Sequence, residues 1–238
     1  MGRIKQYRTA LARYKHSKGF GIHSPFAFYF VRAVLRERCP YYSYLMLEQL
    51  RALVIDRLRQ HVRHPKVISL STAKMLFRVT NFFNPQQILQ VGTSYGVSSA
   101  GMLAVSSSSQ LILCEPKLGE YPVTHSVLAI FGKRISFLAD LTKAIDIYQS
   151  SLGQQLPFIL VNSLTDTGQR DAILPYIDSV IAGKSVVILR NLGRSPLMKQ
   201  LWEECKTMPK HGMTFSNEKI AIVIADPKLP RQDFTIWF

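Results

Sequence analysis

The chain has 238 residues, 47% of them hydrophobic, and its 30 Lys and Arg stand against 15 Asp and Glu, a formal net charge of +15. This length suits one large domain or one domain with an appendage, and the apolar share excludes disorder as the dominant state. Three cysteines, Cys39, Cys114 and Cys205, form no zinc-ligand spacing and exclude a disulfide scaffold, so we expect a reducing, cytoplasmic setting.

The basic excess is concentrated at the N-terminal end. Residues 1–66 carry 14 Lys and Arg against three acids, a net +11, and the remaining residues carry only +4. Such a segment attracts anionic partners, nucleic acid included. A solvated basic helix face is an equally good interpretation, because no nucleic-acid-binding motif accompanies the charge. No run of about 20 mostly apolar residues is present, so we expect no membrane span.

Helices are expected first, in a basic N-terminal helical region over residues 1–84. Ser24 and Pro25 resemble an N-cap followed by a first-position proline, which predicts a helix start. Apolar residues at three- and four-residue spacings predict a second helix, and Asn84-Pro85 ends a third. The expected helices span 24–35, 45–58 and 71–83. Because they precede the first convincing strand, we interpret them as a cap or flank.

From residue 85 to 238 the pattern changes to short apolar runs that alternate with amphipathic stretches. The expected strands are 88–91, 111–114, 135–138, 158–161 and 186–189, with helices near 97–105, 121–131, 141–150 and 169–181. This succession predicts a parallel sheet with right-handed crossovers. Two closer strands, 213–216 and 220–225, predict an antiparallel edge hairpin. The fold class is therefore α/β, a Rossmann-like seven-stranded sheet with an N-terminal helical cap.

A glycine-containing turn joins the first strand to its helix, in the stretch Gly92-Thr93-Ser94-Tyr95-Gly96. Glycine allows a positive φ and the close approach of a ligand, and a helix N-terminus offers free N–H groups to an anion. The carboxyl end of such a strand is the usual ligand crevice of an open sheet.

The next two strands each end in an acid, Glu115 and Asp140. Glu115 follows the turn by about 20 residues, where a ribose would need a hydrogen-bond acceptor. A helix cap or a solvated carboxylate is the alternative interpretation of Glu115.

These residues resemble the class I S-adenosylmethionine-dependent methyltransferases, most closely the catechol-O-methyltransferase-like O-methyltransferases. The resemblance covers roughly residues 86–238, and residues 20–31 resemble the N-terminal helical region of a bacterial group of such proteins. It implies S-adenosylmethionine as the cofactor. By this resemblance Gly92 would lie under the methionine part, Ser98 would bind its carboxylate, Glu115 its ribose hydroxyls, and Asp140 would lie near the adenine. Gly96 completes the glycine motif, and Tyr95 would lie over the cofactor or simply cover the turn.

The sequence departs from this family at two places. Gln90 stands where an acid usually begins the glycine motif; it can hydrogen-bond to a cofactor but supplies no charge. The metal-dependent branch has an acid after the fourth strand and an Asp-Asn or Asp-Asp pair after the fifth, where this chain has Asn162 and Arg190-Asn191. A guanidinium in a Mg²⁺ ligand set would repel the ion, so we expect no metal.

Three catalytic candidates follow: Arg190, Asn162 and His23. Arg190 would replace the metal and orient an anionic or phenolic acceptor; a decayed site, or an ordinary strand-end salt bridge, fits Arg190 as well. His23 adjoins the helix start that would cap the pocket and is a candidate base or substrate contact, although packing or capping is the commoner role of such a histidine.

The leading hypothesis is metal-independent methyl transfer to an oxygen or nitrogen of a small or anionic acceptor. One alternative is a catalytically inactive methyltransferase-fold protein that serves as a binding scaffold. Another is a nucleic-acid-associated protein that uses the basic N-terminal region. The acceptor and the oligomeric state stay open, with a homodimer among the options.

Overall fold

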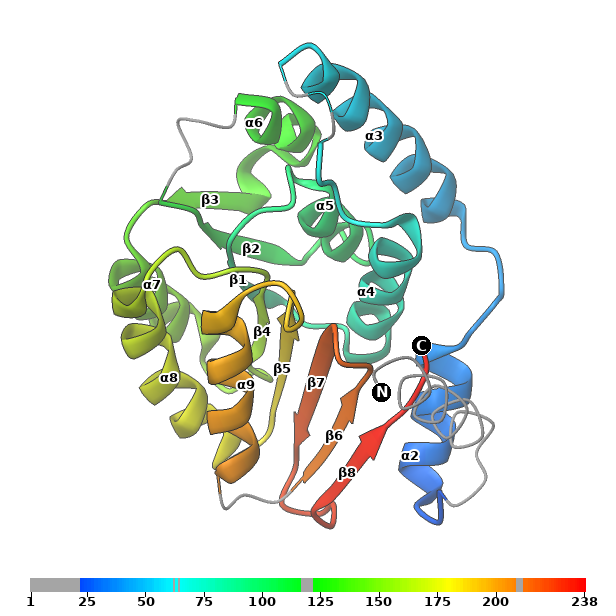
Figure 1. Cartoon of the computed structure of the whole chain (residues 1–238), viewed down its shortest axis with the longest axis vertical. Helices are drawn as coiled ribbons and strands as arrows, with labels where there is room; N and C mark the ends of the chain where they lie inside the picture. Colours follow the sequence, from blue (N-terminus) through cyan, green and yellow to red (C-terminus); the bar gives the residue numbers. More distant parts are fainter. Residues whose placement is uncertain (1–21, 62, 64, 117–121, 209–211) are drawn as a thin grey trace, which may run out of the picture.

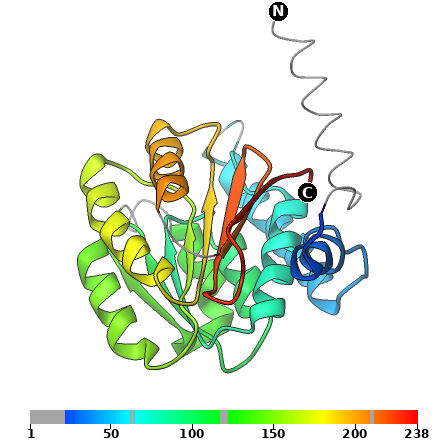
Figure 2. The ribbon, with the colours of Figure 1, turned by 90° about the horizontal axis from the view of Figure 1, so that it is seen from below.

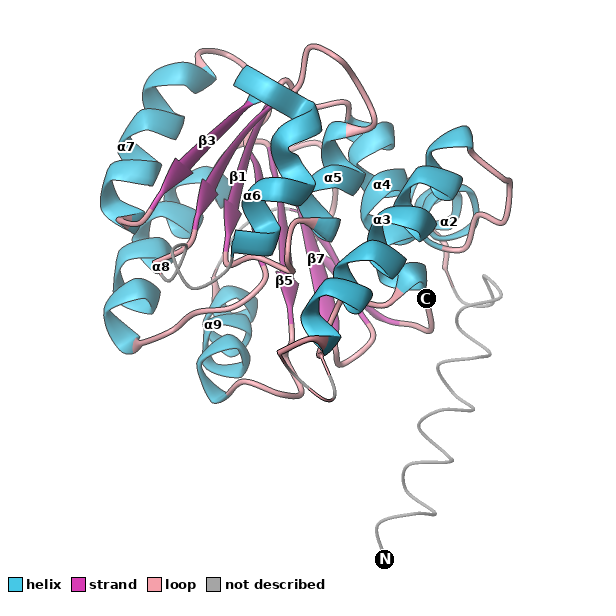
Figure 3. Ribbon diagram, turned by 90° about the horizontal axis from the view of Figure 1, so that it is seen from above, coloured by secondary structure: helices cyan, strands magenta, loops and turns pink. Residues whose placement is uncertain are grey.

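The computed structural model describes residues 22–238 apart from 62, 64, 117–121 and 209–211. Its centre is an eight-stranded sheet with helices on both faces (Figures 1 and 3). The strands are β1 (Gln87–Val91), β2 (Gln110–Cys114), β3 (Ile135–Leu138), β4 (Phe158–Val161), β5 (Ser185–Arg190), β6 (Gly212–Ser216), β7 (Ile220–Ala225) and β8 (Gln232–Thr235). Residues 1–21, the first part of the basic segment, lie outside the described residues.

The helices lie close to their expected positions. They are α2 (Pro25–Phe30) with a π-helical continuation (Val31–Leu35), α3 (Tyr42–Arg59), α4 (Leu70–Phe83), α5 (Val97–Leu103), α6 (Pro122–Leu128) with a 3₁₀ continuation (Ala129–Arg134), α7 (Leu141–Leu152), α8 (Thr167–Ile181) and α9 (Pro196–Thr207). Ser24 caps α2, its hydroxyl accepting a hydrogen bond from the Ala27 N–H. Asn84 ends α4 in the left-handed conformation. No helix in the described part of the chain is long and apolar enough to cross a bilayer.

The sheet order is β3-β2-β1-β4-β5-β7-β6-β8. Strands β1 to β5 pair in parallel, and β6 and β7 form an antiparallel hairpin, as the sequence predicts. Strand β7 also runs antiparallel to β5. The hairpin is not the edge of the sheet, however, because β8 pairs in parallel with β6. Strand β8 is four residues long and alternates between half-buried and exposed, so it carries no apolar run that would reveal it in the sequence.

Two hydrophobic cores lie on the two faces of the sheet, because alternate residues of each strand point to opposite sides. Ile88 of β1 belongs to the core beneath α2 to α6, and Leu89 and Val91 belong to the core beneath α7, α8 and α9. Figure 2 shows the two helical layers on either side of the strands.

The N-terminal helices share the first of these cores. Phe30 of α2 is fully buried, and its ring lies 5.0 Å from that of Phe215 on β6, measured between centroids. It also contacts Phe82 and Phe83 of α4, at 5.5 and 6.0 Å. The helical region therefore packs on the sheet as part of one continuous core.

The chain reverses its direction of travel across the sheet between β1 and β4. From β1 it proceeds through α5 to β2 and then β3, whereas α7 returns it to β4 on the other side of β1. In an open α/β sheet, ligands bind outside the carboxyl ends of the strands at such a switch point. The residues that follow β1 and β4 are therefore the first place to look for a site.

Replacement of Phe30 by Ala should lower the free energy of unfolding by about 3–5 kcal/mol, because it leaves a cavity between α2, α4 and β6. Denaturant unfolding would measure the loss. Phe28→Ala on the same helix is the control, since Phe28 is 39% exposed, and should cost much less. Equal effects of the two variants would contradict the shared core.

Candidate functional site

The turn after β1 requires glycine at two positions. Gly92 and Gly96 have φ values of +75° and +83°, a region that glycine enters without strain. A Cβ on Gly92 would lie 2.3 Å from Ser163 Oγ and 2.9 Å from the Ser163 carbonyl oxygen. The loop after β4 therefore lies directly against the turn. Tyr95, also at positive φ (+54°), is half-buried against the first core.

Glu115, at the end of β2, is held against this turn. The side chain is buried, with 6% of its surface exposed, and its Oε2 accepts a 2.8 Å hydrogen bond from the Thr93 N–H. The structure thus brings the turn and Glu115 together, whereas the contact of Glu115 with a ribose stays a prediction.

Gln90 braces the turn from inside the protein. Its Nε2 donates to the Gly92 carbonyl oxygen at 2.9 Å and to Ser98 Oγ at 3.1 Å, and its Oε1 accepts from Ser99 Oγ at 2.9 Å. All three side chains are fully buried. Gln90 and Ser98, expected to contact a cofactor, are thus both used within the protein.

Asn162 and Arg190 extend this network across the switch point. Asn162 Nδ2 donates to the Gly92 carbonyl oxygen at 2.9 Å and to Ser98 Oγ at 3.3 Å. Arg190 Nη1, which comes from the end of β5, donates to Asn162 Oδ1 and, at 3.0 Å, to Ser94 Oγ on the glycine turn. We call this group the switch-point network; its members are Gln90, Ser94, Ser98, Ser99, Asn162, Arg190 and Asn191, whose Nδ2 donates to the Asn162 carbonyl oxygen.

Arg190 is a buried cation whose hydrogen-bond partners are neutral. Arg190 is only 7% exposed, and no carboxylate of the described residues forms a salt bridge with it. Burial lowers the pKa of Arg190 to about 10, and the charge of Arg194 acts in the same direction, so the guanidinium still carries its proton at pH 7. Its Nε is buried without a partner, which costs about 1–3 kcal/mol of stability. The strand-end salt bridge considered from the sequence is therefore not formed within the described part of the chain.

His23 lies away from the switch-point network. The neighbouring Ser24 Oγ is 4.0 Å from Met213 Sδ, and Met213 pairs with Ile224, which pairs with Val186 at the amino end of β5. Arg190 is four residues beyond Val186 along β5, a rise of about 13 Å from Val186. The structure thus places the exposed His23 near the opposite edge of the sheet, and it does not bring this candidate to the site.

Asp140 is exposed and caps α7. Its Oδ1 accepts a 3.0 Å hydrogen bond from the Lys143 N–H. It lies at the carboxyl edge, after β3, where the sequence places it. Its expected contact with an adenine stays a prediction.

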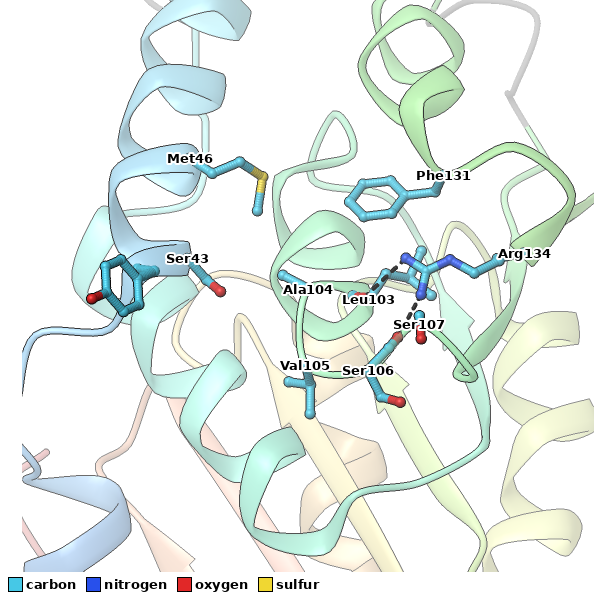
Figure 4. A pocket seen from close by; sticks show the side chains of 10 residues that line it. Ser43, Met46, Leu103, Ala104, Val105, Ser106, Ser107, Phe131 and Arg134 are labelled. Atoms are coloured by element: carbon cyan, nitrogen blue, oxygen red, sulfur yellow. Dashed lines mark hydrogen bonds between the residues drawn. The ribbon is translucent and has the colours of Figure 1, made fainter.

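Two hollows lie elsewhere on the described part of the molecule. One, of about 440 Å³, lies between Met46 of α3, Leu103 at the end of α5, and Phe131; there Arg134 donates to the carbonyl oxygens of Leu103 and Ser106 (Figure 4). These segments immediately precede β2 and β3, so this hollow is at the amino edge of the sheet. The other, of about 850 Å³, lies between α9 and strands β6 and β8. Neither is lined by Gly92, Glu115 or Arg190.

No group of three or more His, Cys, Asp or Glu side chains that could hold a metal ion occurs among the described residues. At the switch point the available donors are amides, hydroxyls and the Arg190 guanidinium.

Sequence reasoning missed three contributors to the site. Ser94 accepts from Arg190, Ser99 donates to Gln90, and Ser163 fills the space beside Gly92. Two of these serines lie in or just after the glycine motif, and the third is next to Asn162. These positions are the signal in the sequence that could have identified them. Serine is so common in turns and caps that this signal carries little weight without coordinates.

The molecule has the fold of the class I O-methyltransferases, as solved structures show. A methyltransferase from Geobacter sulfurreducens matches it with a TM-score of 0.57 at 15% identity, over 82% of this chain and 96% of that one. An O-methyltransferase from Bacillus cereus, in complex with SAH, matches with a TM-score of 0.55 at 16% identity, over 81% and 96%.

An SAH-bound methyltransferase from Podospora anserina gives a TM-score of 0.57 at 11% identity, over 84% of this chain and 95% of that one. No protein-family model matches the sequence, and no curated protein matches it. At such identities the likeness defines the fold, and the chemistry must be argued from the site.

The cysteines should differ sharply in reactivity. Burial raises the pKa of Cys114, which precedes Glu115, and that of Cys205 to about 12, so at pH 8 both thiols are protonated as well as enclosed. Cys39 is exposed. We expect a thiol reagent at pH 8 to modify Cys39 in the native protein and the other two only after unfolding, as a chromogenic disulfide titration would measure. Rapid modification of a Cys39→Ser variant would contradict this.

Proposed function

We propose that the protein binds S-adenosylmethionine at the carboxyl edge of β1 and β2 and transfers its methyl group, without a metal ion, to an oxygen or nitrogen of a small anionic acceptor. The observation that carries this proposal is the buried Glu115 carboxylate held against the glycine turn at the switch-point edge. The fold supports it, since solved structures of this fold include complexes with SAM and SAH.

The residues near Glu115 suit the adenosyl end of the cofactor. A buried carboxylate at the end of the second strand suits a ribose diol, and the turn between Gly92 and Gly96 has the backbone conformation that a close ligand needs. At the expected methionine end, two hydrogen bonds tie the turn to the neighbouring strand ends: Asn162 donates to the Gly92 carbonyl oxygen, and Arg190 donates to Ser94.

When bound, S-adenosylmethionine supplies an electrophilic methyl group on a sulfonium. The work left to this chain is to hold an acceptor atom in line with that methyl and to keep it in its nucleophilic form. Arg190 suits this task, since a fixed guanidinium both orients an anionic acceptor and lowers the acceptor's pKa. Asn162 fixes the guanidinium through its Oδ1.

The proposed independence from metal rests on the chemistry of these donors. Hard cations such as Mg²⁺ take anionic and carbonyl oxygens, and a charged guanidinium at the end of β5 would repel one. Activity and ligand binding should therefore withstand a chelator. The inactive-scaffold alternative shares every contact described so far and differs only in whether methyl transfer occurs. For the nucleic-acid alternative, six of the 14 Lys and Arg of residues 1–66 lie outside the described residues.

Glu115→Gln tests the ribose contact. The amide keeps an oxygen for the Thr93 N–H but loses the charge, so affinity for S-adenosylmethionine and for its demethylated product should fall about tenfold or more, as calorimetry would measure. Glu203→Gln on α9, a carboxylate far along the chain from the turn, is the control and should bind as the parent does.

Unchanged affinity in Glu115→Gln would remove the role of Glu115. A wild-type protein that binds neither compound at millimolar concentration would reject the proposal itself. Transfer of a radiolabelled methyl group to any small molecule in a lysate would exclude the inactive-scaffold alternative.

A further inference from the structure

One edge of the Arg190 guanidinium is left without a partner. Nη1 is used by Asn162 and Ser94, but no hydrogen bond of Nε or Nη2 is formed within the described residues. These two nitrogens lie on the same side of the planar group, and together they are the fork that receives both oxygens of a carboxylate or two oxygens of a phosphate.

No negative charge compensates this cation within the described part of the chain. Its two partners are an amide oxygen and a hydroxyl, and Arg194 adds further positive charge nearby. A buried charge is normally paired, because the loss of hydration is otherwise uncompensated. An oxyanion on the Nε and Nη2 edge would supply both the missing charge and the missing hydrogen bonds.

We infer that Arg190 is the anion-binding group of this site, and that the anion it holds must be present for the positively charged form of the cofactor to bind well. The effect of the anion on cofactor binding rests on the proposed function, whereas the anion site itself does not. The acceptor would thus be a molecule that carries a carboxylate or a similar oxyanion beside the atom to be methylated.

The link between the two ligands is electrostatic. Arg190 contacts Ser94 of the glycine turn, so its charge lies beside the turn that the cofactor would use. S-adenosylmethionine carries a sulfonium charge that S-adenosylhomocysteine lacks. Two unit charges within about 10 Å in a protein repel each other enough to change an equilibrium constant about tenfold. An anion on Arg190 cancels this repulsion, so it should favour the sulfonium compound alone.

The test measures binding by the whole chain, with sodium benzoate as the anion probe. Calorimetry in a Tris buffer free of other oxyanions gives the affinities for S-adenosylmethionine and S-adenosylhomocysteine, each with and without benzoate. We expect the neutral compound to bind about tenfold tighter without benzoate. Benzoate should remove most of that difference by strengthening the binding of S-adenosylmethionine.

Two variants locate the effect. Arg190→Gln should bind both cofactor forms equally, and benzoate should not change its affinities. Arg190→Lys keeps the charge but loses the fork. Its affinities for the two cofactor forms should therefore still differ, and benzoate should have a weaker effect. Lys133→Gln, on the exposed 3₁₀ segment that precedes β3, is the control and should keep the response of the parent. Thermal melts establish that each variant is folded, and the comparison within the wild type needs no variant.

A separate arm asks for the anion alone. Benzoate or inorganic phosphate should raise the melting temperature of the wild type and not that of Arg190→Gln; if the latter does not fold, Arg190→Lys takes its place with a reduced shift. Equal binding of both cofactor forms, unaffected by benzoate, would overturn the inference and leave the proposed function standing. If neither cofactor form binds, the proposed function fails, and the Arg190-dependent shift alone then decides whether the anion site exists.

Discussion

The site depends on one interaction, the reach of a buried guanidinium from the end of β5 across β4 to the glycine turn after β1. Arg190 Nη1 joins Asn162 and Ser94, and Asn162 in turn holds the carbonyl oxygen of Gly92. The loops after β1, β4 and β5 are therefore fixed relative to one another. The side chains that join them carry a single formal charge, that of Arg190. A ligand that binds at this edge must either complement the positive charge of Arg190 or move the guanidinium aside.

Close packing and buried hydrogen bonds hold the glycine turn after β1 in place. Ser163 occupies the space that a side chain at position 92 would need, and Gln90 turns inward to Ser98 and Ser99. A carboxylate in place of Gln90 would add a negative charge beside Ser98, to which Asn162 also donates. The Gln90 amide donates to the Gly92 carbonyl oxygen, which an ionised carboxylate could not do, and it leaves the positive charge of Arg190 uncancelled.

Much of the fold could be predicted from the sequence, because parallel strands buried on both faces appear as short apolar runs, as in Ile88–Val91 and Val186–Leu189. Strand β8 could not, since an alternating four-residue edge strand has no such run. The position of Glu115 against the turn was also predictable from spacing. The partners of Arg190 and the remoteness of His23 were not, because both depend on which strand ends the sheet brings together, and spacing along the chain does not encode that.

The short strand β8 has a consequence for how copies of the chain meet. The exposed edge it presents carries the charged Asp233, next to the exposed Arg231. Charged, four-residue edges resist pairing with a further strand, since the incoming chain would have to strip water from these charges for few backbone hydrogen bonds. Extension of the sheet through β8 from one molecule into the next is thereby disfavoured.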